Sequence, residues 1–194
     1  MMIRIIAIVM VLTMISCKGD KAAAPTNTNG TALAPKPKFD DRLPAPCELL
    51  SASSIASLVS TDEQAIEIKE ASNAQNLFSR ACFFKWDDPS MSDAGVMIQI
   101  MTNPVEDEAP EYLELFIASK KTAGETTMGS DEKVLYSDFP GYGDDGAYSF
   151  QMHKYLWRIG YDYSFLLAFN TALSEEQELA AANTLAAEIM KNVR

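Results

Sequence analysis

Apolar residues recur at helical spacing in three segments of this chain. The pattern predicts helices over residues 48–59, residues 110–122 and from Ser174 to the C-terminal end. Ser51 or Ser53 is placed to cap the first helix internally, and Ser174 with Gln177 has the spacing of a capping box. The buried stripe expected on the second helix is Tyr112, Leu113, Phe116 and Ile117.

Between these helices, apolar and polar residues alternate, which is typical of strands that bury one face. We expect strands over 65–69, 78–86, 95–101, 134–136, 155–160 and 163–170, and another after the turn-rich stretch 138–148. Short turns join consecutive strands, which favours antiparallel pairing. The fold class expected is α+β, with one twisted, mainly antiparallel sheet of about six or seven strands packed by three helices.

The N-terminal pattern is different. Residues 1–4 contain one positive charge, and an apolar run interrupted only by Thr13 extends from Ile5 to Ile15. Such a run is too short to cross a bilayer, which needs ~20 residues, but it fits the apolar region of a secretory signal. Residues 1–16 are therefore predicted to be a signal peptide.

Residues 17–46 have no hydrophobic period and are rich in Pro, Ala and small polar residues. Such a segment buries too little apolar area to offset its ordering entropy, so it is predicted to be a disordered linker with a reach of roughly 30 Å. Phe39 and Leu43, its only large apolar residues after Leu33, either dock on the domain or are incidental. The remaining residues, 47–194, are predicted to form a single domain.

The chain is acidic, with a formal net charge of -11. Removal of residues 1–16 takes away Arg4 alone, which leaves 15 basic and 27 acidic side chains and a net charge of -12. This balance disfavours nucleic acid as a partner, since binding there depends on Lys and Arg. It also disfavours adsorption on anionic lipid through a basic patch.

The apolar run ends in Leu12-Thr13-Met14-Ile15-Ser16-Cys17, which resembles the lipobox of bacterial lipoproteins. Met14 stands where these proteins usually have Leu. The resemblance implies cleavage before Cys17, acylation of that cysteine and anchoring in a lipid bilayer. An ordinary signal peptide with a chance cysteine is the alternative. Lys18, in place of Asp, does not look like an inner-membrane retention signal, so the resemblance favours the outer membrane, on either face.

If Cys17 is acylated, Cys47 and Cys82 remain, and export to an oxidising compartment favours a disulfide between them. Closure of this loop contributes about 4 kcal/mol in the chain-entropy model. The alternative is a reactive thiol pair, but neither cysteine is part of a Cys-x-x-Cys motif or adjacent to a histidine.

His153 is the only histidine, and no Gly-x-Ser-x-Gly motif supplies a serine nucleophile for it. We therefore expect an ordinary strand residue there, and we predict no catalytic residues, no cofactor and no metal site. The aspartates at 87, 88 and 93 and at 144 and 145 invite a calcium hypothesis, but they lack the spacing of a calcium loop and lie in turns, where Asp is common. Gly141 and Gly143 are expected to reverse the chain at positive φ.

Residues 136–169 hold 11 of the 18 aromatic side chains. An aromatic sheet face can bind a ligand, and the candidate contacts are Tyr142, Tyr148, His153 and Tyr161. The alternative is that these rings form the core beneath the last helix. Exposure beside a pocket favours the first interpretation, and burial favours the second.

Four features together resemble a broad group of small bacterial envelope lipoproteins of uncharacterised role. They are Pro46-Cys47-Glu48-Leu49-Leu50, the second cysteine shortly before Trp86, the stretch from Gly141 to Tyr148, and the Ala-rich final helix. Some members are similar to the PsbP-like fold, which implies an α/β/α layering. The resemblance implies no catalytic residues.

These patterns predict a lipid-anchored envelope lipoprotein that binds an envelope protein or a small apolar ligand without catalysis, through its sheet face or the stretch 138–148. The alternatives are an envelope hydrolase with an unrecognised site and a purely structural factor in outer-membrane assembly.

Overall fold

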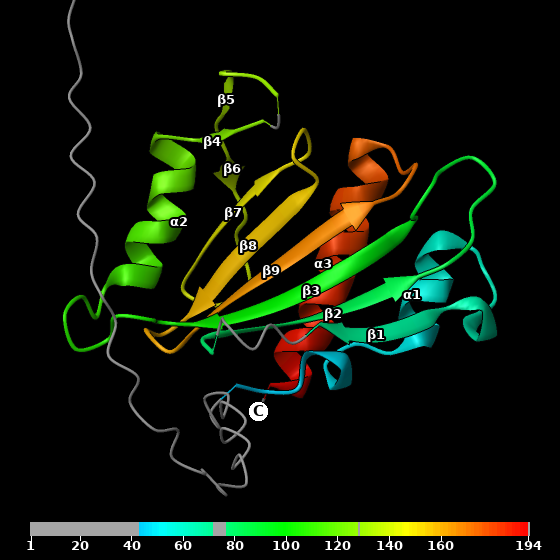
Figure 1. Ribbon diagram of the computed structural model, residues 1–194, viewed down its shortest axis with the longest axis horizontal. Helices are drawn as coiled ribbons and strands as arrows, with labels where there is room; N and C mark the ends of the chain where they lie inside the picture. The colour runs from blue at the N-terminus through cyan, green and yellow to red at the C-terminus, as the bar shows by residue number, and fades with distance from the viewer. Residues whose placement is uncertain (1–42, 72–76, 128, 194) are drawn as a thin grey trace, which may run out of the picture. The chain divides into compact units, whose positions relative to one another are not determined.

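The computed structural model describes residues 43–71, 77–127 and 129–193 (Figure 1). The predicted signal peptide, the acylation site Cys17 and the linker up to residue 42 lie outside the described residues. Leu43 and Pro46, which the sequence places in the linker, are buried. The packed body therefore begins no later than Leu43.

A fully antiparallel sheet of seven strands forms the centre of the fold, in the order β1-β2-β3-β9-β8-β7-β6 (Figure 1). A separate hairpin pairs β4 with β5. The strands are β1 (Glu67–Ala71), β2 (Ser79–Lys85), β3 (Gly95–Thr102), β4 (Glu125–Thr126), β5 (Lys133–Val134), β6 (Ser137–Asp138), β7 (Asp145–Ser149), β8 (Lys154–Ile159) and β9 (Tyr163–Asn170).

Three α-helices pack on this sheet, namely α1 (Ala52–Val59), α2 (Tyr112–Thr122) and α3 (Glu175–Asn192). Helix α3 crosses one face (Figure 1), and α1 lies beside it, since the Ser51 amide donates to Glu188 Oε1 at 3.0 Å. Helix α2 packs against β7 and β8 on the other face. The predicted α+β class, the antiparallel sheet and the three helices are confirmed.

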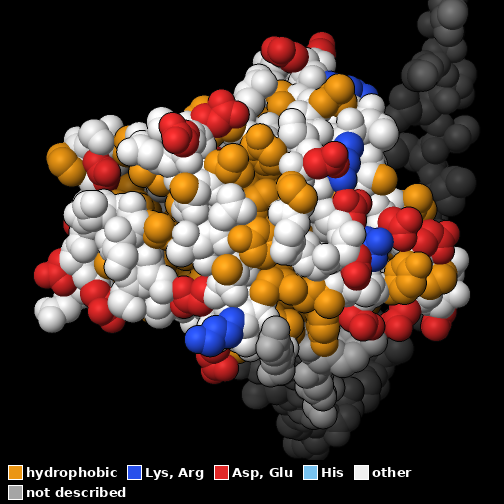
Figure 2. Space-filling model, turned by 180° about the vertical axis from the view of Figure 1, so that it is seen from behind, with side chains coloured by type: hydrophobic (Ala, Val, Ile, Leu, Met, Phe, Trp, Pro, Cys, Tyr) orange, Lys and Arg blue, Asp and Glu red, His pale blue; other side chains and the backbone are white. Residues whose placement is uncertain are grey.

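The main core lies between the sheet and α3. Alternate side chains of β2, β3, β8 and β9 point toward the helix, so the predicted alternation is confirmed in these strands. The buried members on these strands are Cys82, Phe84, Val96, Ile98, Ile100, Tyr155, Trp157, Phe165, Leu167 and Phe169. Most of the aromatic residues between 136 and 169 therefore contribute to packing. From the side of α3, Figure 2 shows hydrophobic side chains in a central band with acidic side chains around it.

The expectations for the first helix and for the first strand need correction. The first helix begins at Ala52 rather than 48, because Ser51 caps it: its Oγ accepts a hydrogen bond from the Ser54 amide at 3.2 Å. A 3-10 turn over Pro46–Glu48 precedes it. The first strand is β1 rather than 65–69, and it is exposed along its whole length instead of half-buried. It is the edge strand, so Ile68 is 46% exposed.

Two other predictions of local structure are confirmed. Cys47 and Cys82 form a disulfide that fastens the segment before α1 to β2. Helix α3 begins with the expected capping box, in which the Gln177 amide donates to Ser174 Oγ and the Ser174 amide donates to Gln177 Oε1.

Candidate functional site

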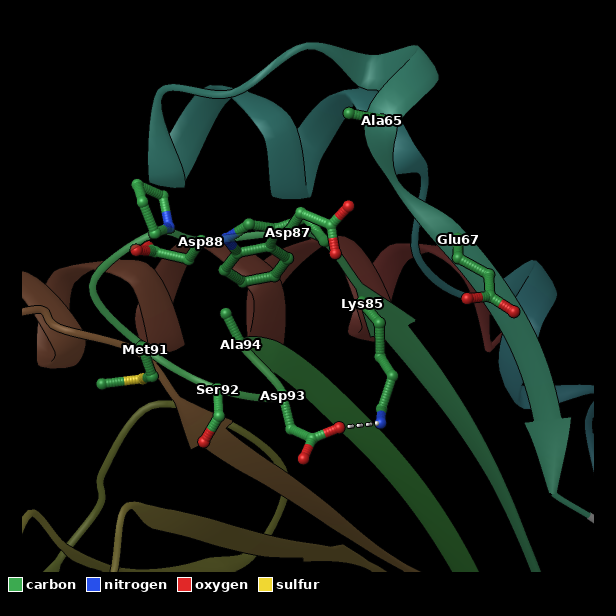
Figure 3. Close-up of a pocket in the computed structure, with 11 residues that line it drawn as sticks. Ala65, Glu67, Lys85, Asp87, Asp88, Met91, Ser92, Asp93 and Ala94 are labelled. Atoms are coloured by element: carbon green, nitrogen blue, oxygen red, sulfur yellow. Dashed lines mark hydrogen bonds and ion pairs between the residues drawn. The ribbon is translucent and has the colours of Figure 1, made fainter.

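A hollow of about 610 Å³ lies where β1, the end of β2 and the connection from β2 to β3 meet (Figure 3). Its volume falls within the range typical of small-ligand sites. The lining residues are Ala65, Glu67, Lys85, Trp86, Asp87, Asp88, Pro89, Met91, Ser92, Asp93 and Ala94.

The connection between β2 and β3 is held in shape by its own hydrogen bonds. The Trp86 amide donates to the Ala94 carbonyl at 3.3 Å, which closes the base of the connection. Inside it, the amide and hydroxyl of Ser90 donate to Asp88 Oδ1 at 2.8 and 2.6 Å, and they hold the pKa of Asp88 below its usual value. Asp93 has a left-handed backbone with φ 56°. This fixed connection positions the carboxylates around the hollow.

The hollow is negatively charged. Four of its lining residues are acidic and only Lys85 is basic. Lys85 Nζ pairs with Asp93 Oδ1 at 3.1 Å, as the dashed line in Figure 3 shows. Among the described residues, neither the Glu67 nor the Asp87 carboxylate has a hydrogen-bond or ion-pair partner. These two carboxylates are therefore available to a ligand.

Trp86 gives the hollow an apolar wall. The residue belongs to the main core and is only 9% exposed, so its ring is fixed by packing. Its indole Nε1–H donates to no described residue and is accessible to solvent, unlike the indole N–H of Trp157, which is buried without an acceptor. The hollow thus combines a fixed aromatic ring, one free donor and two unpaired carboxylates.

His153 lies in the turn between β7 and β8, with φ 52°, so the prediction of a strand residue is wrong. Its Nδ1 is 2.7 Å from Oε2 of Glu178, which is fully buried in the first part of α3. The Tyr155 hydroxyl donates to Oε1 of the same carboxylate at 3.1 Å. An ionised carboxylate can only accept, so His153 Nδ1 carries the hydrogen when Glu178 is charged.

Burial raises the pKa of Glu178, while hydrogen bonds from His153 and Tyr155 act in the opposite direction. Burial and the adjacent carboxylate also raise the pKa of Tyr155. The sequence analysis missed Glu178, although a signal was present. With Ala182, Leu185 and Ile189 it forms one helical stripe, and it is the polar member of that stripe.

The three tyrosines among the predicted ligand contacts have different environments. The Tyr142 hydroxyl donates to the Asn183 carbonyl of α3 at 2.8 Å, and its ring packs on Phe139. Tyr148 stacks on Tyr155, with ring centroids 5.5 Å apart, which places it next to the cluster of His153 and Glu178. Tyr161 is 54% exposed in the turn after β8. A binding role for Tyr142, Tyr148, His153 and Tyr161 stays a prediction.

A further polar cluster joins α2 to the sheet. Glu125 pairs with Lys120 and Lys154 and accepts a hydrogen bond from the Tyr136 hydroxyl. Burial alone would raise the pKa of Glu125, but these donors lower it to about 2. Every charge in the cluster has a partner, so its evident role is to fasten α2 and β4 to β8.

In the described ranges, no group of three or more His, Cys, Asp and Glu residues could hold a metal ion. The aspartates of the stretch 138–148 fasten it to neighbouring segments: Asp144 Oδ2 accepts from the Gly160 amide at 2.6 Å, and Asp145 pairs with Lys121 of α2 at 2.7 Å. No described helix is long and apolar enough to cross a membrane.

Comparisons with protein-family models, with curated proteins and with solved structures gave no match. Function is therefore inferred from the residues of this chain.

Proposed function

We propose that this protein is a lipid-anchored lipoprotein of a bacterial envelope whose folded body binds a ligand without catalysis. The apolar run from Ile5 to Ile15, followed by Cys17, supports the anchor. The hollow around Trp86 supports the binding role, and it is the observation that carries the proposal.

Three properties of the hollow favour ligand binding over a purely structural role. Its volume is about 610 Å³, its wall contains a fixed aromatic ring, and it has polar groups with no partner among the described residues. Concave sites that combine apolar walls with a few oriented polar groups are typical of small-ligand pockets. The polar groups of the Glu125 and Glu178 clusters, in contrast, are bonded to one another.

The binding role can be tested by amide NMR with small neutral, anionic and cationic molecules. We expect shift changes to converge on the Trp86 indole N–H and on the amides of residues 86–94. A Trp86→Phe variant keeps an aromatic ring but loses the N–H donor, and it should bind more weakly. Shift changes that scatter over the surface or centre on other residues would contradict a site in this hollow.

The anchor can be tested separately by growing cells on a radioactive fatty acid. The parent protein should carry label and sediment with the outer-membrane fraction, because acyl chains contribute ~0.8 kcal/mol per buried CH₂. A Cys17→Ser variant should lose label and sedimentation together. Cys47→Ser is the matched control and should keep its label. Label that persists in the Cys17→Ser variant would refute acylation at this position.

One observation favours a second candidate, an envelope hydrolase. The pairing of His153 with buried Glu178 resembles the arrangement that orients a general base, and the His153 side chain is 41% exposed. If this pair is catalytic, the protein should hydrolyse generic ester or peptide substrates, and a His153→Asn variant should lose that activity. Equal rates for parent and variant would remove this candidate.

A further inference from the structure

We infer that the hollow around Trp86 binds an organic cation, namely an ammonium group on a short apolar body that carries an oxygen acceptor. This inference rests on the proposed binding function and specifies the ligand class for the same hollow. It draws on three observations: the charge of the lining residues, the aromatic ring of Trp86 and the hydrogen-bond donor on that ring.

The first observation is the charge that remains after internal pairing. Lys85, the only base of the lining, is engaged by Asp93, and Ser90 donates to Asp88. Glu67 on β1 and Asp87 after β2 remain unpaired among the described residues. In Figure 3 both carboxylates lie above the ion pair of Lys85 and Asp93, Asp87 near the centre of the view and Glu67 to its right on β1. Both carboxylates line the same hollow, so a cationic ligand there is attracted to both.

The second observation is the Trp86 ring. Tryptophan offers the most favourable face for an ammonium group, and the attraction grows where water is excluded. Because Trp86 is held in the core, binding requires little ordering of its side chain. Pro89, Met91 and Ala94 add apolar surface to the lining, which suits a short apolar body.

The third observation is the indole Nε1–H of Trp86. It has no acceptor among the described residues, and the nitrogen is accessible to solvent. A simple metal ion or a bare alkylammonium cannot accept a hydrogen bond. A ligand with a hydroxyl or carbonyl oxygen near its ammonium group satisfies the donor and the carboxylates together.

Choline and 3,3-dimethyl-1-butanol provide a matched pair of probes. The two molecules have nearly the same shape and the same hydroxyl, but only choline is charged. We expect choline to shift the Trp86 indole N–H resonance and to bind at least tenfold more tightly than the neutral alcohol at low ionic strength. Its affinity should fall as salt rises to 0.15 M, because salt screens exposed charges.

Substitutions that each remove one carboxylate charge test where choline binds. Asp87→Asn and Glu67→Gln should each weaken choline binding severalfold while they leave the folded spectrum unchanged, since both side chains are exposed. Asp131→Asn is the matched control, because it removes one exposed carboxylate outside the hollow. A control variant that weakens binding as much as Asp87→Asn would overturn the local assignment.

The outcomes separate the ligand class from the proposed function. If the neutral alcohol binds in the hollow as tightly as choline, or if only other molecules shift residues 86–94, the cation assignment fails and the binding function stands. If no probe of any charge shifts these residues, both fail. Choline selectivity that depends on Asp87 and Glu67 but not on Asp131 supports the inference.

Discussion

Among the described residues, Glu178 is a carboxylic acid whose side chain is fully buried. A buried carboxylate is unfavourable unless donors replace the water it has lost. His153 and Tyr155 supply those donors. The position of Glu178 near the start of α3 also favours negative charge, because the amide dipoles of the helix point their positive end there. His153 therefore contributes to the packing of α3 on the sheet.

Replacement of His153 tests this role, and Asn is the suitable substitute because it tolerates the positive φ. His153→Asn should lower the free energy of unfolding by about 1–3 kcal/mol at pH 7, since it leaves a buried carboxylate short of a donor. The loss should be smaller at pH 4. The pKa of Glu178 is higher in the folded protein than in the unfolded chain. Ionisation of Glu178 therefore costs no folding stability below the unfolded pKa, and the cost develops as pH rises through the folded pKa. Urea unfolding at the two pH values measures the difference.

Glu178→Gln provides the control for that experiment. It removes the charge but keeps a group of the same shape, so the effect of His153→Asn in this background should be nearly the same at pH 4 and pH 7. If His153→Asn lowers the free energy of unfolding equally at pH 4 and pH 7 in the protein that keeps Glu178, the hydrogen bond to the ionised carboxylate does not determine the effect.

At the scale of elements, the sequence predicted those that bury one face. Strands β2, β3, β8 and β9 and helix α3 have clear periods because one side of each packs in the core. The edge strand β1 was predicted as half-buried, since alternation cannot reveal which strand lies at the edge of a sheet. Strands β4, β5 and β6 have two residues each, too few for a period to be visible.

The candidate site was less predictable, because distant parts of the chain form it. The aspartates at 87, 88 and 93 were expected in turns, and they were considered as calcium ligands. The approach of Glu67 depends on the pairing of β1 with β2, which sets Glu67 opposite Lys85. The contact between His153 and Glu178 spans 25 residues and depends on how α3 crosses the sheet. Local spacing contains no information on either contact.

The loop that enters β7 depends on a glycine whose conformation was anticipated. Gly143 has φ +63°, and a Cβ atom there would overlap the carbonyl oxygen of Arg158. Gly143→Ala should therefore destabilise the protein by about 3 kcal/mol or more. Gly160→Ala is the control: its φ of +56° is similar but its nearest contact is 3.7 Å away, so it should cost only about 1 kcal/mol. Thermal unfolding compares the two, and equal losses would mean that the overlap is relieved by a small shift of the loop.

At the scale of the whole molecule, the disulfide determines how the N-terminal part of the body is held. Cys47 precedes α1, and Cys82 lies fully buried in the middle of β2. The disulfide joins two residues that are 35 positions apart in the sequence. Cys82 belongs to the core that β2 shares with α3. An oxidising compartment, as the proposed export requires, keeps this link closed.

Reduction of this disulfide should therefore weaken the entire body rather than one segment. In the chain-entropy model a loop of this length contributes about 4 kcal/mol, so a reducing agent should lower the urea midpoint of a Cys17→Ser protein strongly. A variant that also carries Cys47→Ala and Cys82→Ala should start at the lower stability and show no response to the reducing agent. If this triple variant matches the oxidised protein, native packing alone would hold the N-terminal segment. In that case, a reducing compartment would be as compatible with the fold as an oxidising one.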